Sequence, residues 1–159
     1  MSKVKPIPDG ASALTPYLSC TNAAEMIDFY KNAFGATEKF RLTQPDGRIG
    51  HAEIAIGGAS LMLADEFPEM GFLSPKSLPG GARSPVAIHL YVEDVDATHL
   101  QAMRAGATSL KEPTDEFFGD RNAHLKDPSG HVWFLSTRIE EVSPTEMQRR
   151  FDAAMKEGG

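Results

Sequence analysis

The sequence predicts an α+β protein in which one β-α-β-β-β module occurs twice. Two short sequence motifs that occur twice support this prediction, because repeats at a nearly constant offset indicate a repeated structural unit. An arginine followed three residues later by a histidine occurs at Arg48 and His51, and again 73 residues later at Arg121 and His124. A Gly-Ala-Thr tripeptide occurs at residues 35–37 and again 71 residues later. The strand and helix signals also follow the same order in both halves.

The first module is predicted to cover residues 14–66. Residues 14–20 alternate apolar and polar side chains, which indicates a strand. Asn22 followed by Glu25 is typical of a capping-box helix start, and Gly35 is a natural stop at the end of that helix. An apolar residue recurs at helical spacing between these two signals. The module therefore begins with a strand and a helix.

Three strands are predicted to complete this module. Residues 37–44 are strand-like, and Pro-Asp-Gly at 45–47 is a strong turn signal. Residues 48–56 form the next predicted strand. Two glycines at 57–58 then close a hairpin into a strand at residues 60–65.

The segments outside the two modules have weak periodicity. Residues 1–13 contain prolines and a glycine, which predicts an N-terminal arm. Residues 67–85 are rich in proline, glycine and serine, which predicts a connector without regular elements that can also cover a site. The connector separates the two predicted modules.

The second module is predicted to cover residues 86–140. Asp94 is expected to cap its helix and Gly106 to end it. Pro113 and the residues up to 120 are expected to form a loop, and Asp-Pro-Ser-Gly at 127–130 a β-turn. The predicted strands lie at residues 86–92, 108–112, 121–126 and 131–137.

Residues 141–159 are predicted to contain a C-terminal helix. Ser143, Pro144 and Glu146 combine an N-cap, a proline at the first helical position and a capping-box glutamate. One side of this helix is apolar, which predicts packing against its own sheet or a second subunit. The apolar residues are Met147, Phe151, Ala154 and Met155.

Composition narrows the classes of partner. The net charge is −6 and no basic run interleaved with aromatics occurs, which argues against nucleic acid and anionic membranes as partners. The single cysteine, Cys20, excludes an internal disulfide and is compatible with a reducing compartment. No signal peptide or membrane-spanning window is evident. The expected location is therefore the cytoplasm.

Several motifs give the chain a family resemblance. Residues 29–36, Phe-Tyr-Lys-Asn-Ala-Phe-Gly-Ala, and residues 127–133, Asp-Pro-Ser-Gly-His-Val-Trp, resemble the vicinal oxygen chelate superfamily, the glyoxalase, bleomycin resistance and dioxygenase group. His-Ala-Glu at 51–53, Leu-Ala-Asp-Glu at 63–66 and Gly-Asp-Arg at 119–121 resemble its PhnB-like branch. The resemblance covers roughly residues 12–140. It is specific for fold and weak for reaction, because one fold hosts many chemistries.

The resemblance implies that each module curls its sheet around a cavity and covers the convex side with its helix. Strand alternation agrees independently. Ala52, Ile54 and Ile56 are expected to face the helix. His51 and Glu53, with Ala55, are then expected to face the cavity.

The metal site of metal-dependent relatives is predicted to be missing. In those relatives, four ligands come from the first and last strands of the two modules, usually histidine and glutamate. The matching positions here are Thr15, Met62, Ala87 and Phe134. None is a histidine or carboxylate ligand, so no cofactor is expected at the usual place.

A displaced metal site is the alternative. His51, Glu53 and His89 are its candidate ligands for a divalent metal, provided that they converge. Glu53 and His51 are also the candidate catalytic pair for metal-free acid–base work, because histidine titrates near neutrality. The structural interpretation is that His51 pairs with Glu53 or Tyr17 in a hydrogen-bonded patch.

Two arginines follow turns at corresponding places in the modules. Arg48 and Arg121 can clamp an anionic ligand or pair with the turn aspartates Asp46 and Asp120, and we favour the pairing. Besides the candidate catalytic pair, ten residues are predicted to contact a ligand. They are Thr15, Tyr17, Ser19, Met62, His89, Tyr91, Phe118, Arg121, His124 and Phe134.

Two functions follow from the resemblance. The first is binding of a small organic molecule in the sheet cavity, as in bleomycin-resistance-type relatives, commonly across a homodimer. Its support is the loss of all four usual ligands and the apolar Met62, Phe117, Phe118 and Phe134. The second is an enzyme, either a lyase, isomerase or dioxygenase with the displaced metal site, or the metal-free acid–base catalyst. No signature of other catalytic classes occurs.

Overall fold

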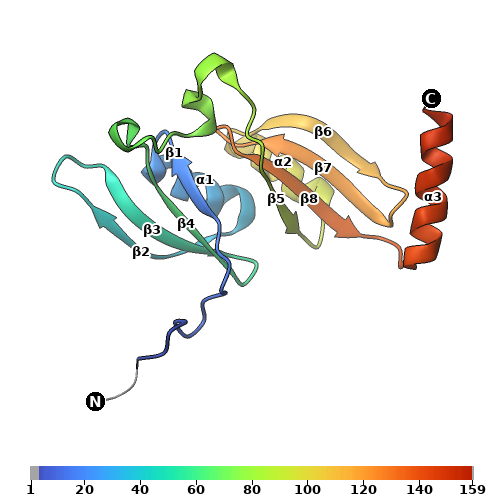
Figure 1. Ribbon diagram of the computed structural model, residues 1–159, viewed down its shortest axis with the longest axis horizontal. Helices are drawn as coiled ribbons and strands as arrows, with labels where there is room; N and C mark the ends of the chain where they lie inside the picture. Colours follow the sequence, from blue (N-terminus) through green and yellow to red (C-terminus); the bar gives the residue numbers. More distant parts are fainter. Residues whose placement is uncertain (1–3, 159) are drawn as a thin grey trace.

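Each half of the chain folds into a four-stranded sheet with one helix on one face. The computed structural model describes residues 4–158. Positions 1–3 of the predicted arm and position 159 of the predicted C-terminal segment lie outside the described residues. The order β-α-β-β-β occurs twice, as the sequence predicted. Figure 1 shows the two sheets beside each other, with α1 and α2 behind them.

The first sheet has the strand order β1-β4-β3-β2, and β1 and β4 run parallel. Asn22 caps α1 by accepting a hydrogen bond from the Glu25 amide, and Gly35 ends the helix with a φ of +67°. Asp65 at the end of β4 accepts hydrogen bonds from the amides of Ala23 and Ile49, which ties the helix start to the sheet. The elements are β1 (Tyr17–Cys20), α1 (Ala23–Phe34), β2 (Thr37–Thr43), β3 (Ile49–Ile56) and β4 (Ala59–Asp65).

The second sheet repeats this topology, with the order β5-β8-β7-β6. Asp94 caps α2 and Gly106 ends it, as predicted. Thr137 accepts a hydrogen bond from the Val95 amide, in the place that Asp65 occupies in the first module. The elements are β5 (Ala87–Tyr91), α2 (Val95–Ala105), β6 (Thr108–Asp115), β7 (Asp120–Lys126) and β8 (Val132–Arg138).

Three predicted segments differ from the structure. The first strand begins at Tyr17, later than predicted, after Pro16, which has no amide hydrogen to pair. The strand predicted to end at residue 112 continues through Pro113 to Asp115. β6 tolerates this proline because it is an edge strand and need not donate on its open side. The connector contains three 3-10 turns, Pro68–Met70, Pro75–Ser77 and Pro79–Gly81.

The modules are joined through their helices and through the turn before β8. α1 packs against α2, whereas among the described residues no strand of one sheet pairs with a strand of the other. The carboxylate of Asp127 accepts hydrogen bonds from Tyr30 of α1 and from Trp133 of β8. His131 donates from Nε2 to the Ser19 carbonyl of β1, at 2.7 Å. The Asp-Pro-Ser-Gly turn is therefore a joint between the modules.

The C-terminal helix α3 (Pro144–Glu157) stands at the far end of the second module (Figure 1). Ser143 caps it, as predicted. Phe151 lies against Phe117, with ring centroids 5.8 Å apart, and Arg150 pairs with Glu140. None of its residues is buried, so its apolar side is covered only in part by its own chain. No helix of the described residues is long and apolar enough to cross a bilayer.

Candidate functional site

Each sheet has one face turned to its helix and one face that no helix covers, and we call the uncovered surfaces the open faces. On β3, Ala52, Ile54 and Ile56 are buried under α1, which confirms the predicted alternation. His51 and Glu53 lie on the open face and are partly exposed. The period of two along a strand therefore places the predicted pair away from the helix.

The open face of the first sheet combines polar and apolar side chains. Tyr17 and Glu53 flank Met62, because both residues pair with Met62 in the strand ladders. Phe40 and Leu42 of β2 pair with Glu53 and His51 and are 44% and 59% exposed. Sequence reasoning missed these two residues, although the strand alternation of residues 37–44 carried the signal. Large apolar side chains on an exposed strand face are a feature of binding surfaces.

His51 is held by a hydrogen bond on each side of its ring. Its Nδ1 lies 2.7 Å from the Tyr17 hydroxyl, and its Nε2 lies 3.5 Å from the Glu53 carboxylate. Burial raises the pKa of Tyr17. In the tautomer with its hydrogen on Nε2, His51 accepts from the Tyr17 hydroxyl and donates to the Glu53 carboxylate. The structural pairing of His51 with Tyr17 and Glu53 is therefore confirmed, and their catalytic roles stay a prediction.

The open face of the second sheet carries a different set of groups. His89 Nε2 lies 2.9 Å from the Ser136 hydroxyl, which also accepts a hydrogen bond from Asn122. Because Ser136 already accepts from an amide, its own hydrogen can be donated to His89 Nε2. His89 also lies edge-on to the Tyr91 ring, at 4.6 Å between centroids.

Two further contacts complete this second face. Tyr91 donates to the Asp120 carboxylate, and this hydrogen bond raises the pKa of Tyr91. His124 stacks on Phe134, with ring centroids 3.9 Å apart. The four predicted ligand-contacting residues of this module's face, His89, Tyr91, His124 and Phe134, therefore lie next to one another.

Arg121 lies on the opposite side of its strand from this face. Its guanidinium pairs with Asp96 of α2 and with Asp115 of β6. Strand alternation explains this position, because Arg121 is one residue away from Asp120 and Asn122, which are on the open face. The predicted pairing of Arg121 with Asp120 is wrong, because Arg121 pairs with Asp96 and Asp115 instead. Its predicted contact with a ligand stays a prediction. Arg48 does pair with Asp46, as predicted.

Phe118 and Thr15 lie at the margins of the predicted site. Phe118 is in the turn between β6 and β7, with its ring edge-on to Phe117. Phe117 in turn contacts α3, so this aromatic pair belongs to the base of the C-terminal helix. Thr15 precedes β1, and its hydroxyl hydrogen-bonds to the Ser12 carbonyl.

Ser19 is buried on β1 beside Phe72 of the connector. The Ser19 hydroxyl donates a hydrogen bond to the Phe72 carbonyl.

The three candidate ligands of a displaced metal site are divided between the two sheets. His51 and Glu53 are on β3, and His89 is on β5. Within the described part of the chain, no group of three histidine, cysteine, aspartate or glutamate side chains is arranged to hold a metal ion. The positions that carry the metal ligands in metal-dependent relatives offer a thioether, a benzyl group, a methyl group and one hydroxyl here, from Met62, Phe134, Ala87 and Thr15 respectively. That donor set does not fit a divalent metal.

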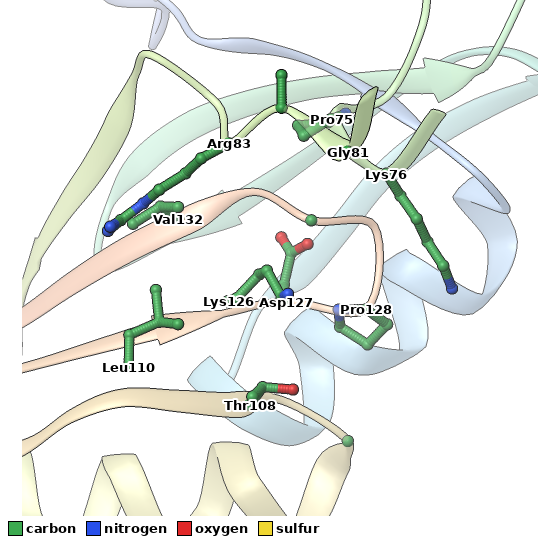
Figure 2. A pocket seen from close by; sticks show the side chains of 13 residues that line it. Pro75, Lys76, Gly81, Arg83, Thr108, Leu110, Lys126, Asp127, Pro128 and Val132 are labelled. Carbon is green, nitrogen blue, oxygen red and sulfur yellow. The ribbon is translucent and has the colours of Figure 1, made fainter. Parts of the chain in front are cut away.

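A pocket of about 650 Å³ lies beneath the connector, at one end of the second sheet. Figure 2 shows Arg83 extending over Val132 and Lys76 extending past Pro128, with Thr108 and Leu110 opposite. Sequence reasoning predicted that the connector covers a site but named none of its basic residues. Lys126 of β7 also lines this pocket.

Comparison with known proteins gives one family and many structural neighbours. The model of the Glyoxalase/Bleomycin resistance protein/Dioxygenase superfamily matches residues 14–135. An uncharacterised protein of Mycobacterium bovis is 43% identical over 150 residues, which cover 92% of this chain and 94% of that protein.

Two solved structures illustrate the fold. TioX from Micromonospora superposes with a TM-score of 0.60 at 22% identity, covering 81% of this chain and 100% of that one. The fosfomycin resistance protein FosX of Listeria monocytogenes, solved with Mn(II) and sulfate, has a TM-score of 0.59 at 16% identity, covering 91% and 99%. At such identities the likeness concerns the fold alone.

Proposed function

Because this chain belongs to the Glyoxalase/Bleomycin resistance protein/Dioxygenase superfamily, we propose that it binds a small organic molecule on its open faces, as a homodimer whose two chains close the cavity. Its motifs favour the PhnB-like branch. The proposal assigns the protein a binding role that needs neither the family's four-ligand metal site nor another cofactor.

The observation that carries this proposal is the composition of the open faces. They bring together hydrogen-bonding groups, such as His51 and His89, with exposed aromatic rings, such as Tyr17, Phe40 and Tyr91. Small-molecule sites have this composition, with an apolar lining and a few placed polar groups. In such a site, however, most of the ligand surface is buried. Two separate open sheets in one chain do not enclose a ligand, and a second copy would.

The edges of the two sheets support a second copy as the missing wall. β1 and β5 are edge strands with one side unpaired. Large apolar residues are exposed at these edges, with Leu14 87%, Tyr17 44%, Val86 66% and Tyr91 60% exposed. An unpaired strand edge beside exposed apolar residues favours pairing with another chain. We assign the edge of β1 in one chain and that of β5 in the other to the dimer contact.

The dimer is tested by charging one edge. Val86→Asp is expected to weaken self-association at least about tenfold, because it places an unpaired carboxylate in an apolar contact. Analytical ultracentrifugation of the wild type should give twice the 17.3 kDa chain mass, and the variant a monomer at the same concentration. Leu100→Asp is the matched control, because Leu100 is 50% exposed on α2, away from both edges. A monomeric wild type, or a dimer that Val86→Asp leaves intact, contradicts the arrangement.

A further inference from the structure

We infer that the pocket beneath the connector is an oxyanion site that binds the carboxylate or phosphate group of a small organic molecule, held by Arg83 and Lys126. The site lies at one end of the open face of the second sheet, because Lys126 is on the same side of β7 as His124. It deepens the proposed function, but its residues are distinct from those around His51 and His89, so its test can fail separately. It combines a cavity, two cations from distant segments and an apolar lining.

The first argument is the position of the two cations. Lys126 of β7 and Val132 of β8 are direct partners in the strand ladder. Figure 2 shows Arg83 reaching from the connector over Val132, and Arg83 and Lys126 both line the pocket. Both cations line one pocket, and an oxyanion bound there is attracted to both positive charges. Burial, followed by the positive charges of Lys111 and Arg83, lowers the pKa of His124 on the neighbouring part of β7.

The second argument is that the protein supplies no carboxylate to these cations. Within residues 4–158, the ion pairs are formed by other lysines and arginines, and neither Arg83 nor Lys126 takes part in one. The one acid among the lining residues is Asp127, which is 2% exposed. Its carboxylate already accepts four hydrogen bonds from its own surroundings. In a chain with a net charge of −6, a pocket with unpaired cations is an unusual local arrangement.

The third argument is that the pocket is built before a ligand arrives. The Lys76 amide donates to the Ser129 carbonyl, and the Ser74 amide donates to Glu66, which seats the connector on the sheet. Gly130 permits this close approach, since a Cβ there would lie 2.9 Å from the Lys76 nitrogen. A volume of about 650 Å³ lies within the usual range for small-molecule pockets.

The lining identifies the chemical class of ligand. Arg83 offers a planar guanidinium, whose paired N–H groups match the two oxygens of a carboxylate or phosphate. Leu110, Val132 and Pro75 supply apolar surface beside it. A free inorganic anion needs no such surface. We therefore assign the site to an organic anion with an apolar body.

The test is a titration followed by amide shifts in two-dimensional NMR at low salt. Benzoate and phenyl phosphate are the anionic probes, and benzyl alcohol is the neutral one. Both anions are expected to shift the amides of Arg83, Thr108 and Lys126, and benzyl alcohol to shift them far less. Added salt should weaken anion binding, because charge pairs are screened. Tighter binding of phenyl phosphate identifies phosphate as the preferred group, and tighter binding of benzoate identifies carboxylate.

Charge removal then tests the two cations. Arg83→Gln and Lys126→Gln are each expected to weaken anion binding by about tenfold, the size of one charge-assisted contact. Both residues are exposed, so the same spectra will show an intact fold. Lys156→Gln is the control, because Lys156 is an exposed lysine of α3, at the far end of the molecule (Figure 1). The inference is overturned if neither anion shifts these amides, if the neutral probe binds as well, or if both pocket variants bind anions like the wild type.

Discussion

Asp127→Ala is expected to lower the free energy of unfolding by about 3–5 kcal/mol, because it leaves several buried hydrogen-bond donors without an acceptor. The carboxylate accepts from the Tyr30 hydroxyl at 2.6 Å, from the Trp133 indole at 2.9 Å, and from the amides of Ser129 and His131 at 3.0 Å each. Tyr30 is 0% exposed and Trp133 1% exposed, so water cannot replace the lost acceptor. A typical domain has only about 5–15 kcal/mol of stability, so the loss is severe.

The effect should also be cooperative, since Asp127 joins the two modules. Tyr30 belongs to the first module and Trp133 to the second. Trp133 is the single tryptophan, so its fluorescence in a urea titration reports the unfolding directly. Asp28→Ala is the control, because Asp28 is exposed on α1, and it should change stability by no more than about 0.5 kcal/mol. A loss below about 1 kcal/mol for Asp127→Ala would show that the turn does not hold the modules together.

Gly119→Ala is expected to lower the free energy of unfolding by about 2–4 kcal/mol, because of backbone strain and a steric clash. Gly119 has a φ of +95°, which disfavours any side chain. A Cβ there would lie 2.6 Å from the Glu140 carbonyl oxygen and 2.8 Å from Val142. The Gly119 carbonyl also accepts from the amides of Ile139 and Glu140, which fixes the chain between β8 and α3.

Gly47→Ala separates the two causes. Gly47 has a similar φ of +88°, and no atom lies within 4 Å of a Cβ placed there. It should therefore show the strain alone, about 1–2 kcal/mol in the same urea titration. Equal losses for the two variants would mean that the close approach of Glu140 contributes nothing.

The sequence predicted those features whose causes are local. Asn22, Asp94 and Ser143 each accept a hydrogen bond from an amide three residues away, so a short motif is sufficient to place a helix start. The period of two along a strand likewise placed His51 and Glu53 on one face. The repeat then fixed the order of elements in the second half.

The features that escaped prediction depend on contacts between distant segments. Arg121 pairs with Asp96, 25 residues earlier, and local sequence pointed instead to its neighbour Asp120. The pocket brings Arg83 of the connector to Lys126 of β7, and neither residue stands in a motif. Asp127 was recognised as part of a turn, but its hydrogen bond to Tyr30 spans 97 residues. A single sequence carries no direct record of such pairings.

The central claim, that the open faces bind a small organic molecule, is tested most directly by mapping bound fragments onto the protein. Wild-type protein is titrated with small aromatic and aliphatic amines, alcohols and carboxylates, and amide shifts are assigned by residue. We predict shifts that cluster around Tyr17, His51 and Glu53 and around His89 and Tyr91, and that weaken in His51→Ala and Glu53→Gln. Glu112→Gln, an exposed residue of β6, should behave like the wild type. If no fragment shifts these faces, or if all shifts lie beneath the connector, the binding role of the faces is contradicted, and in the second case the oxyanion site stands alone.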